Sequence, residues 1–111
     1  MLSESHTAVV TRNETWRGQA TSEAYEAGWA REAVIFIRAL KTPIGPTARG
    51  QVEISPDGMH WVAEGTAFDF PGAKNNLAVA RVCHFGNWLR IRADLEEGAE
   101  TTILISMHLK A

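Results

Sequence analysis

The stretch from Gln51 to Glu64, QVEISPDGMHWVAE, constrains the fold more than any other part of the chain. Before the turn, apolar and polar residues alternate, which is the period-two pattern of a half-buried strand. Pro56-Asp57-Gly58 then supplies a fixed φ, a side chain that hydrogen-bonds its own backbone, and a residue that tolerates positive φ. An extended pattern resumes at His60-Trp61-Val62. The segment therefore predicts a β-hairpin.

The C-terminal third continues in the same way. Three further strands are predicted there, separated by turn residues, over 77–84, 88–95 and 101–109. In the second of them Leu89 and Ile91 face inward, whereas Arg90 and Arg92 face outward. Short strands with turn signals at this spacing predict an all-β fold, an antiparallel β-sandwich that is jelly-roll-like with seven to eight strands.

The run from Trp29 to Lys41, WAREAVIFIRALK, is compatible with two elements. Its Ala, Glu, Arg and Leu content favours a helix with one apolar stripe. Its β-branched and aromatic block, Val34 to Ile37, favours a strand. Because the other elements are β, we expect a strand here, of the kind that lies in the centre of a sheet and is buried on both faces.

Length and composition indicate what kind of protein this is. The 111 residues are predicted to form a single domain, 1–111, and 45% are hydrophobic, which is typical of a globular chain. The net charge of −2 argues against a nucleic-acid partner. Without a signal-peptide pattern or a membrane-length apolar run, we expect cytoplasmic synthesis and no membrane partner. The single cysteine, Cys83, lies in an apolar run and is predicted to be a buried thiol.

The sequence contains no recognisable catalytic or metal-binding pattern. The four histidines, His6, His60, His84 and His108, are not spaced as metal ligands, so no metal and no cofactor is expected. No serine stands in a nucleophile elbow. Glu53 has the position of a carboxylate on the solvated face of a strand. We therefore predict a protein that is not an enzyme.

Four tryptophans are the remaining candidates for function. Trp61 is predicted to pack in the core under the hairpin. Trp88 falls on the same strand face as Arg90 and Arg92, where it either packs against the outside of the sheet or forms an exposed aromatic and arginine strip. A strip of this kind suits a subunit interface or a sugar platform. The predicted contact surface consists of Trp88, Arg90, Arg92 and Arg81.

The hairpin and the later strand also carry a family resemblance. Ser55, Asp57, Gly58 and Trp61, followed by Leu89-Arg90-Ile91, resemble the discoidin-type galactose-binding jelly roll over about residues 51 to 95. That resemblance implies carbohydrate binding. The same SPDG…W hairpin is similar to one in small structural β-sandwich domains of phage tails and capsids. Discoidin-type domains are longer, commonly carry a cysteine pair and are secreted, so the phage-type resemblance fits this chain better.

Three hypotheses follow from the sequence. The first is a non-enzymatic structural or interaction protein that self-associates, as a homo-oligomer, or docks on a larger assembly such as a virion or capsid-like particle. The second is a carbohydrate-binding module of discoidin-like type, with a glycan as partner. The third, a small cupin-like hydrolase or isomerase, lacks the expected set of His and Glu metal ligands.

Overall fold

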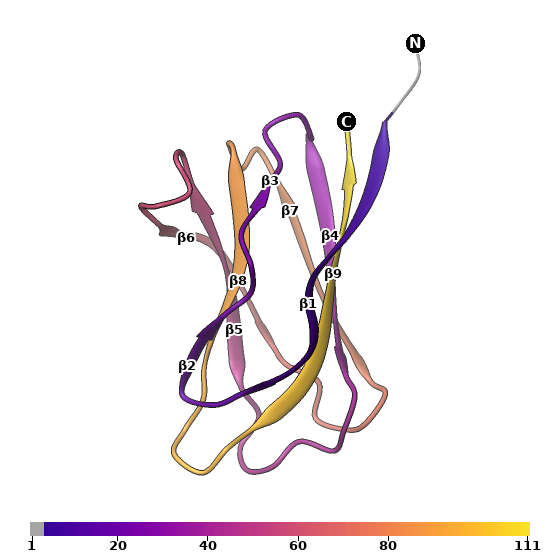
Figure 1. Cartoon of the computed structure of the whole chain (residues 1–111), viewed down its shortest axis with the longest axis vertical. Coiled ribbons are helices and arrows are strands. Elements are labelled where there is room, and N and C mark those ends of the chain that lie inside the picture. The colour runs from indigo at the N-terminus through magenta and orange to yellow at the C-terminus, as the bar shows by residue number, and fades with distance from the viewer. Residues whose placement is uncertain (1–3) are drawn as a thin grey trace.

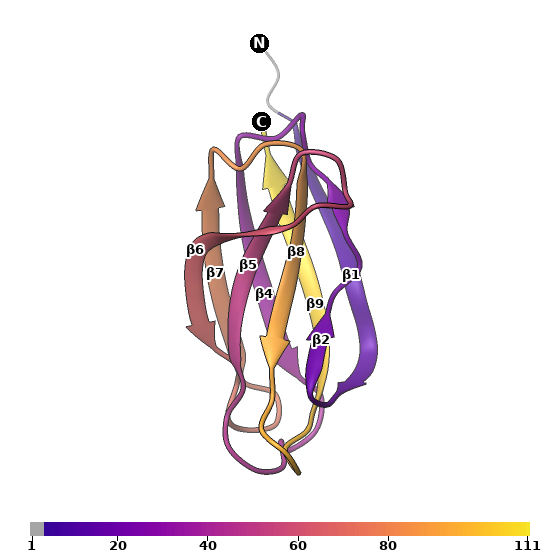
Figure 2. The same cartoon turned by 90° about the vertical axis from the view of Figure 1, so that its left-hand side faces the viewer.

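The computed structural model describes residues 4–111, which form nine strands and no helix. The strands pack as two antiparallel sheets, face to face (Figure 1, Figure 2). The predicted all-β sandwich is therefore confirmed. The strands are, in chain order, β1 (Ser5–Trp16), β2 (Gln19–Thr21), β3 (Tyr25–Glu26), β4 (Glu32–Ala39), β5 (Arg49–Ser55), β6 (Val62–Asp69), β7 (Leu77–Cys83), β8 (Trp88–Asp94) and β9 (Thr101–Lys110).

The two sheets differ in size. The four-stranded sheet has the order β1-β9-β4-β7, and the five-stranded sheet has the order β2-β8-β5-β6, with β3 also paired to β8. β2 pairs with one end of β8, at Asp94 to Arg92, and β3 with the other, at Leu89 and Trp88. β2 and β3 thus share one strand position. The nine strands occupy eight positions, which agrees with the predicted number.

The pairing of these eight positions is nested. β5 pairs with β6, β4 with β7, β2 and β3 with β8, and β1 with β9, so that the first position joins the last and the fourth joins the fifth. This is a long antiparallel ribbon rolled over on itself, the arrangement of a jelly roll. The predicted hairpin at Gln51 to Glu64 is the innermost pair of the ribbon, but its second strand begins at Val62 and not at His60, so that residues 56–61 form the connection.

The ambiguous segment at Trp29 to Lys41 contains a strand, β4, as predicted. The expectation that this strand is buried on both faces is wrong, because Val34 and Phe36 on its outer face are only half-buried. Ala33, Ile35 and Ile37 are completely or almost completely buried and face the core. The strand lies between β9 and β7, so both of its edges are hydrogen-bonded. Tertiary pairing therefore outweighs the helix propensity of this segment.

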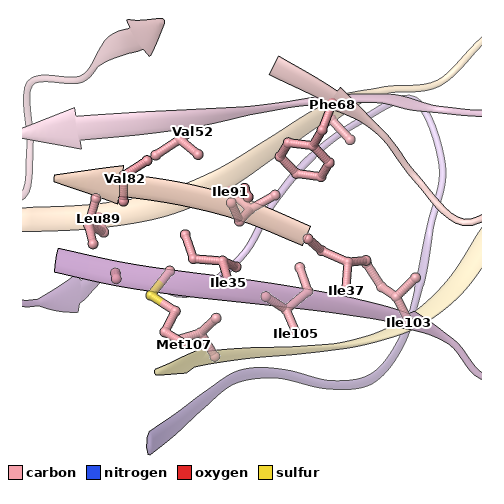
Figure 3. Close-up of a cluster of buried hydrophobic side chains, with 14 of the residues drawn as sticks. Ile35, Ile37, Val52, Phe68, Val82, Leu89, Ile91, Ile103, Ile105 and Met107 are labelled. Atoms are coloured by element: carbon pink, nitrogen blue, oxygen red, sulfur yellow. The ribbon is translucent and has the colours of Figure 1, made fainter. Parts of the chain in front are cut away.

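A single hydrophobic cluster fills the space between the sheets. Side chains from β4, β7 and β9 face side chains from β5, β6 and β8 across this space (Figure 3). Each fully buried aliphatic side chain contributes about 1.5–3 kcal/mol of transfer free energy. The predicted inward faces of the last two strands are confirmed, since the following residues are at most 1% exposed: Leu89, Ile91, Ala93, Ile103, Ile105, Met107 and Leu109.

Cys83 corrects one prediction. The thiol was expected in the core, but the residue is exposed. In β7, Ala80 and Val82 face inward, and Arg81 and Cys83 face outward. The apolar run around Cys83 was misleading because strand alternation sends every second side chain to the outer face, whatever its polarity.

The two ends of the described chain lie side by side (Figure 1). Ser5 is opposite Lys110 in the pairing of β1 with β9. The backbone N–H of Ala111 donates a hydrogen bond to the carbonyl oxygen of Glu4 at 3.0 Å. Both outer strands of the ribbon therefore begin or end at the same pole of the sandwich.

Candidate functional site

The predicted contact residues do not all lie on one surface. Trp88, Arg90 and Arg92 alternate with buried residues along β8 and lie on the outer face of the five-stranded sheet. Arg81 projects from β7, on the outer face of the four-stranded sheet. The structure therefore groups three of the four residues and separates Arg81 from them. The two outer faces have different chemistry.

Arg90 is held on both sides by neighbours on its own sheet. Its Nε donates a hydrogen bond to Oε1 of Glu53 at 2.7 Å, because strand pairing places these residues opposite each other. Its guanidinium carbon lies 4.1 Å from the centre of a Trp61 ring, which is a cation–π contact. These contacts fix the arginine against the sheet.

Two predictions about this face are wrong. Trp61 is not in the core but half-buried on the outer face, with its ring covered by Arg90. Glu53 is not a solvated carboxylate, since its side chain is only 8% exposed. The cause is the same for both: the long side chain of Arg90, from β8, lies against Glu53 of the paired strand β5 and over the ring of Trp61 in the hairpin connection.

Arg92 completes the charged group on this face. It lies 3.4 Å from Asp94 and 3.9 Å from the second oxygen of Glu53. Glu53 therefore has an arginine on each oxygen. Arg90 and Glu53 are paired within the sheet, whereas Nε of Arg92 is buried without a hydrogen-bond partner. The Arg90–Glu53 pair joins β5 to β8.

The hairpin turn is fixed by two side chains. Ser55 Oγ accepts hydrogen bonds from the backbone N–H groups of Asp57 and Gly58, at 3.2 and 2.8 Å. Asp57 Oδ1 accepts the N–H groups of Met59 and His60, at 2.8 and 2.9 Å. The backbone hydrogen bond from His60, and then that from Met59, hold the pKa of Asp57 well below its usual range.

Trp88 packs against this turn. Gly58 has φ +80°, and a Cβ on it would lie 3.2 Å from the indole ring of Trp88. The tryptophan is half-buried, in an outer packing position beneath the turn. It was predicted on the outer face and lies there.

The outer face of the four-stranded sheet is largely apolar. Its centre is formed by side chains that alternate with the core residues of β4, β7 and β9, and Leu77 among them is 60% exposed. A shallow groove of about 320 Å³ crosses this face. We call this surface the apolar face, and its central residues are Val34, Phe36, Leu77, Val79 and Leu104.

Polar groups surround the apolar face. His108 lies 5.2 Å from Phe36, ring centre to ring centre, at an interplanar angle of 88°. Arg38 donates a hydrogen bond to Oδ1 of Asn75 at 3.1 Å. Arg81 is opposite Val34 in the strand pairing. The sequence signal for this surface was present in β4, whose apolar residues occupy both faces of the strand.

A third feature lies where β1 approaches β3. The ring of His6 is 6.2 Å from that of Tyr25 and nearly parallel to it, and 6.4 Å from that of Trp29 and nearly perpendicular to it. Glu4 and Ser5 complete the lining of an open cavity of about 570 Å³. We call His6, Tyr25 and Trp29 the aromatic corner. Because these residues come from separate parts of the chain, no local sequence motif predicts it.

Within 4–111, no three residues of the types His, Cys, Asp and Glu lie close enough together to hold a metal ion. The same part of the chain contains no helix long and apolar enough to cross a membrane.

Comparisons with known proteins give structural neighbours only. No family model matches the sequence, and a search of curated proteins found no match. The SPBc2 prophage-derived protein YomS superposes with a TM-score of 0.66 at 8% identity, over all of this chain and 96% of that one. The PBSX exported protein XepA gives 0.66 at 12% identity, over 94% of this chain and 36% of that one.

A structure of infectious bursal disease virus, Gx strain, gives a TM-score of 0.50 at 10% identity, over 97% of this chain and 32% of that one. At these identities the likeness shows the fold alone. The chain shares its β fold with two phage-derived proteins and a viral one, which agrees with the phage-type resemblance of the hairpin. None of the three is described as a discoidin-type domain.

Proposed function

We propose that the protein is a non-enzymatic structural component that self-associates within a larger assembly of the virion or capsid type. The observation that carries this proposal is the apolar face. An antiparallel sandwich usually carries polar residues on its outer faces. Here β4 and β7 present Val34, Phe36, Leu77 and Val79 outward, and contiguous apolar surface of this kind is typical of interaction sites.

Two other observations support the proposal. The fold is shared with phage-derived and viral proteins. The charged groups of the opposite face, Glu53, Arg90 and Arg92, are engaged with one another, and Asp57 is engaged with the turn backbone. These charged groups hold strands and the turn together, and we assign them no catalytic role.

Sedimentation velocity over a wide range of protein concentration tests self-association. We expect the weight-average sedimentation coefficient to rise with concentration, because burying the apolar face removes it from water. A strict monomer at the highest attainable concentration would remove the proposal.

Carbohydrate binding is a second candidate, and the aromatic corner favours it. Aromatic rings with a nearby carboxylate, here Tyr25, Trp29 and Glu4, are a suitable surface for a sugar ring and its hydroxyl groups. A glycan array probed with the wild-type chain and with Trp29→Ala tests this. Binding that is lost in the variant would support it, and an array without binding by the wild-type chain would exclude it.

A further inference from the structure

The outward residues of β4 form an ordered series along the apolar face. They are Glu32, Val34, Phe36 and Arg38, since the residues between them face the core. A negative charge therefore stands at one end of the strand and a positive charge at the other, with two apolar side chains between. Six residues of strand separate the charges by about 20 Å.

This series is complementary to itself in one orientation. Two copies can pack with their apolar faces together, related by a two-fold axis that lies between the faces and runs across the strands. β4 of one copy then lies antiparallel over β4 of the other. In this arrangement Glu32 of each copy approaches Arg38 of the other, and Val34 approaches Phe36.

The same two-fold axis also places β9 over β9 and β7 over β7 of the second copy, and it does not bring like charges opposite each other on these strands. The pairing aligns Glu32 with Lys110 of β9, and Arg38 with Leu104. The two-fold axis therefore brings Lys110 over Leu104, and in β7 it brings Arg81 over Val79. The other two-fold axis, parallel to the strands, would instead superpose Glu32 on Glu32 and Arg38 on Arg38, which is electrostatically unfavourable.

We infer that the occupant of the apolar face is a second copy of this chain, packed antiparallel so that two symmetry-related Glu32–Arg38 ion pairs close the ends of an apolar interface. This inference rests on the proposed self-association and specifies its surface and orientation. Sheets packed in this way lie about 10 Å apart and cross at about 30°. The side chains of Glu32 and Arg38 are exposed and long enough to meet across that distance.

Charge reversal tests the orientation, measured by sedimentation equilibrium. Glu32→Arg and Arg38→Glu, each alone, replace two attractive contacts by repulsive ones, and we expect each to weaken dimerisation by at least about tenfold. The double variant exchanges the charges and restores the attraction, so its dimerisation constant returns towards that of the wild type. Phe36→Asp abolishes the dimer.

The matched control is Arg49→Glu, which makes the same charge change on the other sheet, where Arg49 is exposed and paired with Asp69. It should leave dimerisation unchanged. Circular dichroism and thermal unfolding of every variant confirm that the monomer is folded, so that a lost dimer reports on the interface.

A second measurement is thiol cross-linking. In a Cys83→Ser background, Glu32→Cys and Arg38→Cys variants are treated with a short bis-maleimide, separately and as a mixture, because sheets about 10 Å apart place the cysteines beyond the reach of a direct disulfide. The antiparallel arrangement predicts cross-linked dimers chiefly in the mixture, because position 32 of one copy faces position 38 of the other.

The outcomes separate this inference from the proposed function. A wild-type chain that never self-associates overturns both. Self-association that withstands Phe36→Asp and both charge reversals overturns the surface assigned here but leaves self-association standing. Single reversals that weaken the dimer without rescue in the double variant, or cross-links within each separate variant, overturn the antiparallel orientation.

Discussion

Glu53 shows how a charged residue becomes structural on a sheet face. Its carboxylate is almost completely buried, yet it has an arginine on each oxygen, Arg90 at 2.7 Å and Arg92 at 3.9 Å. A buried charge is tolerated only when it is paired and hydrogen-bonded. Glu53 is the member that the two arginines share, so its removal leaves Arg90 without a carboxylate partner and Arg92 with Asp94 alone.

We expect Glu53→Ala to lower the free energy of unfolding by about 1.5–3 kcal/mol, because the variant leaves Arg90 partly desolvated and unpaired. Denaturant titration measures the change. The control is Asp69→Ala, which removes an exposed ion pair with Arg49 and should cost less than about 1 kcal/mol. Equal effects of the two variants would contradict the structural role of Glu53.

Asp57 makes a pH-dependent contribution to stability. Hydrogen bonds from the backbone of His60 and Met59 lower its pKa in the folded state below the unfolded value of about 3.9. A depressed carboxyl pKa stabilises the fold above the unfolded pKa, and this stabilisation is lost as the pH falls through the folded pKa.

The measurement is the free energy of unfolding of the wild type and of Asp57→Asn, from pH 6 downwards. We expect the difference between the two to be constant near neutral pH and to shrink below about pH 4, because the carboxylate then becomes protonated in the unfolded chain while it stays ionised in the folded one. Asparagine can still accept the two backbone hydrogen bonds, so it isolates the charge. A difference that does not vary with pH would exclude this role.

Among the elements, β5 contains a position, Gly50, that lies directly against two aromatic rings at the end of the hairpin. Gly50 is buried beneath the stacked rings of Phe68 and Phe70, whose centres are 5.6 Å apart. A Cβ on Gly50 would contact Phe70 and lie 2.8 Å from Cζ of Phe68. Only glycine lets the strand pass under both rings.

Gly50→Ala should therefore lower the free energy of unfolding by about 1–3 kcal/mol through overpacking. Gly72→Ala is the control, because a Cβ there meets only Thr47 Oγ1 at 3.8 Å, and we expect a change within about 0.5 kcal/mol. Thermal or urea unfolding of the two variants provides the comparison. Similar stabilities would show that the aromatic pair can move aside.

The elements were more predictable than the surfaces. Alternation in β8 and β9 and the turn residues between strands gave the sandwich, because strand period and turn chemistry are local properties. Exposure was less predictable, since it depends on which strand lies next to which. Glu53 and Trp61 were misjudged because Arg90, far away in sequence, covers both. The apolar residues on both faces of β4 were visible in the sequence, but the extent of the apolar face depends on the register of β4 against β7 and β9, which no local pattern contains.

At the scale of the whole molecule, the two ends of the described chain lie next to each other. β1 and β9 are antiparallel neighbours, and Ala111 is hydrogen-bonded to Glu4. A short linker between these residues would convert β9 and β1 into a hairpin, the shortest connection for an antiparallel pair. Neither strand would have to move.

We therefore expect a circular permutant to fold, with Ala111 linked to Glu4 by glycine and serine and new ends opened between Glu97 and Gly98. These residues are exposed and connect β8 to β9. The new ends should cost about 1 kcal/mol or less, which corresponds to a fall in Tm of about 4–8 °C for a chain of this size. Circular dichroism and calorimetry measure the outcome, and an unfolded permutant would contradict it.

The nested pairing has a consequence for the order of folding. Once the connection at residues 56–61 has joined β5 to β6, each outer pair is brought together by the pair inside it. Each step then closes a loop much shorter than the sequence separation suggests. Substitutions in β5 and β6 should then slow refolding, whereas substitutions in β1 and β9 should mainly accelerate unfolding. A fold whose first and last strands pair can in this way form its strand pairs in sequence, from the central hairpin outward.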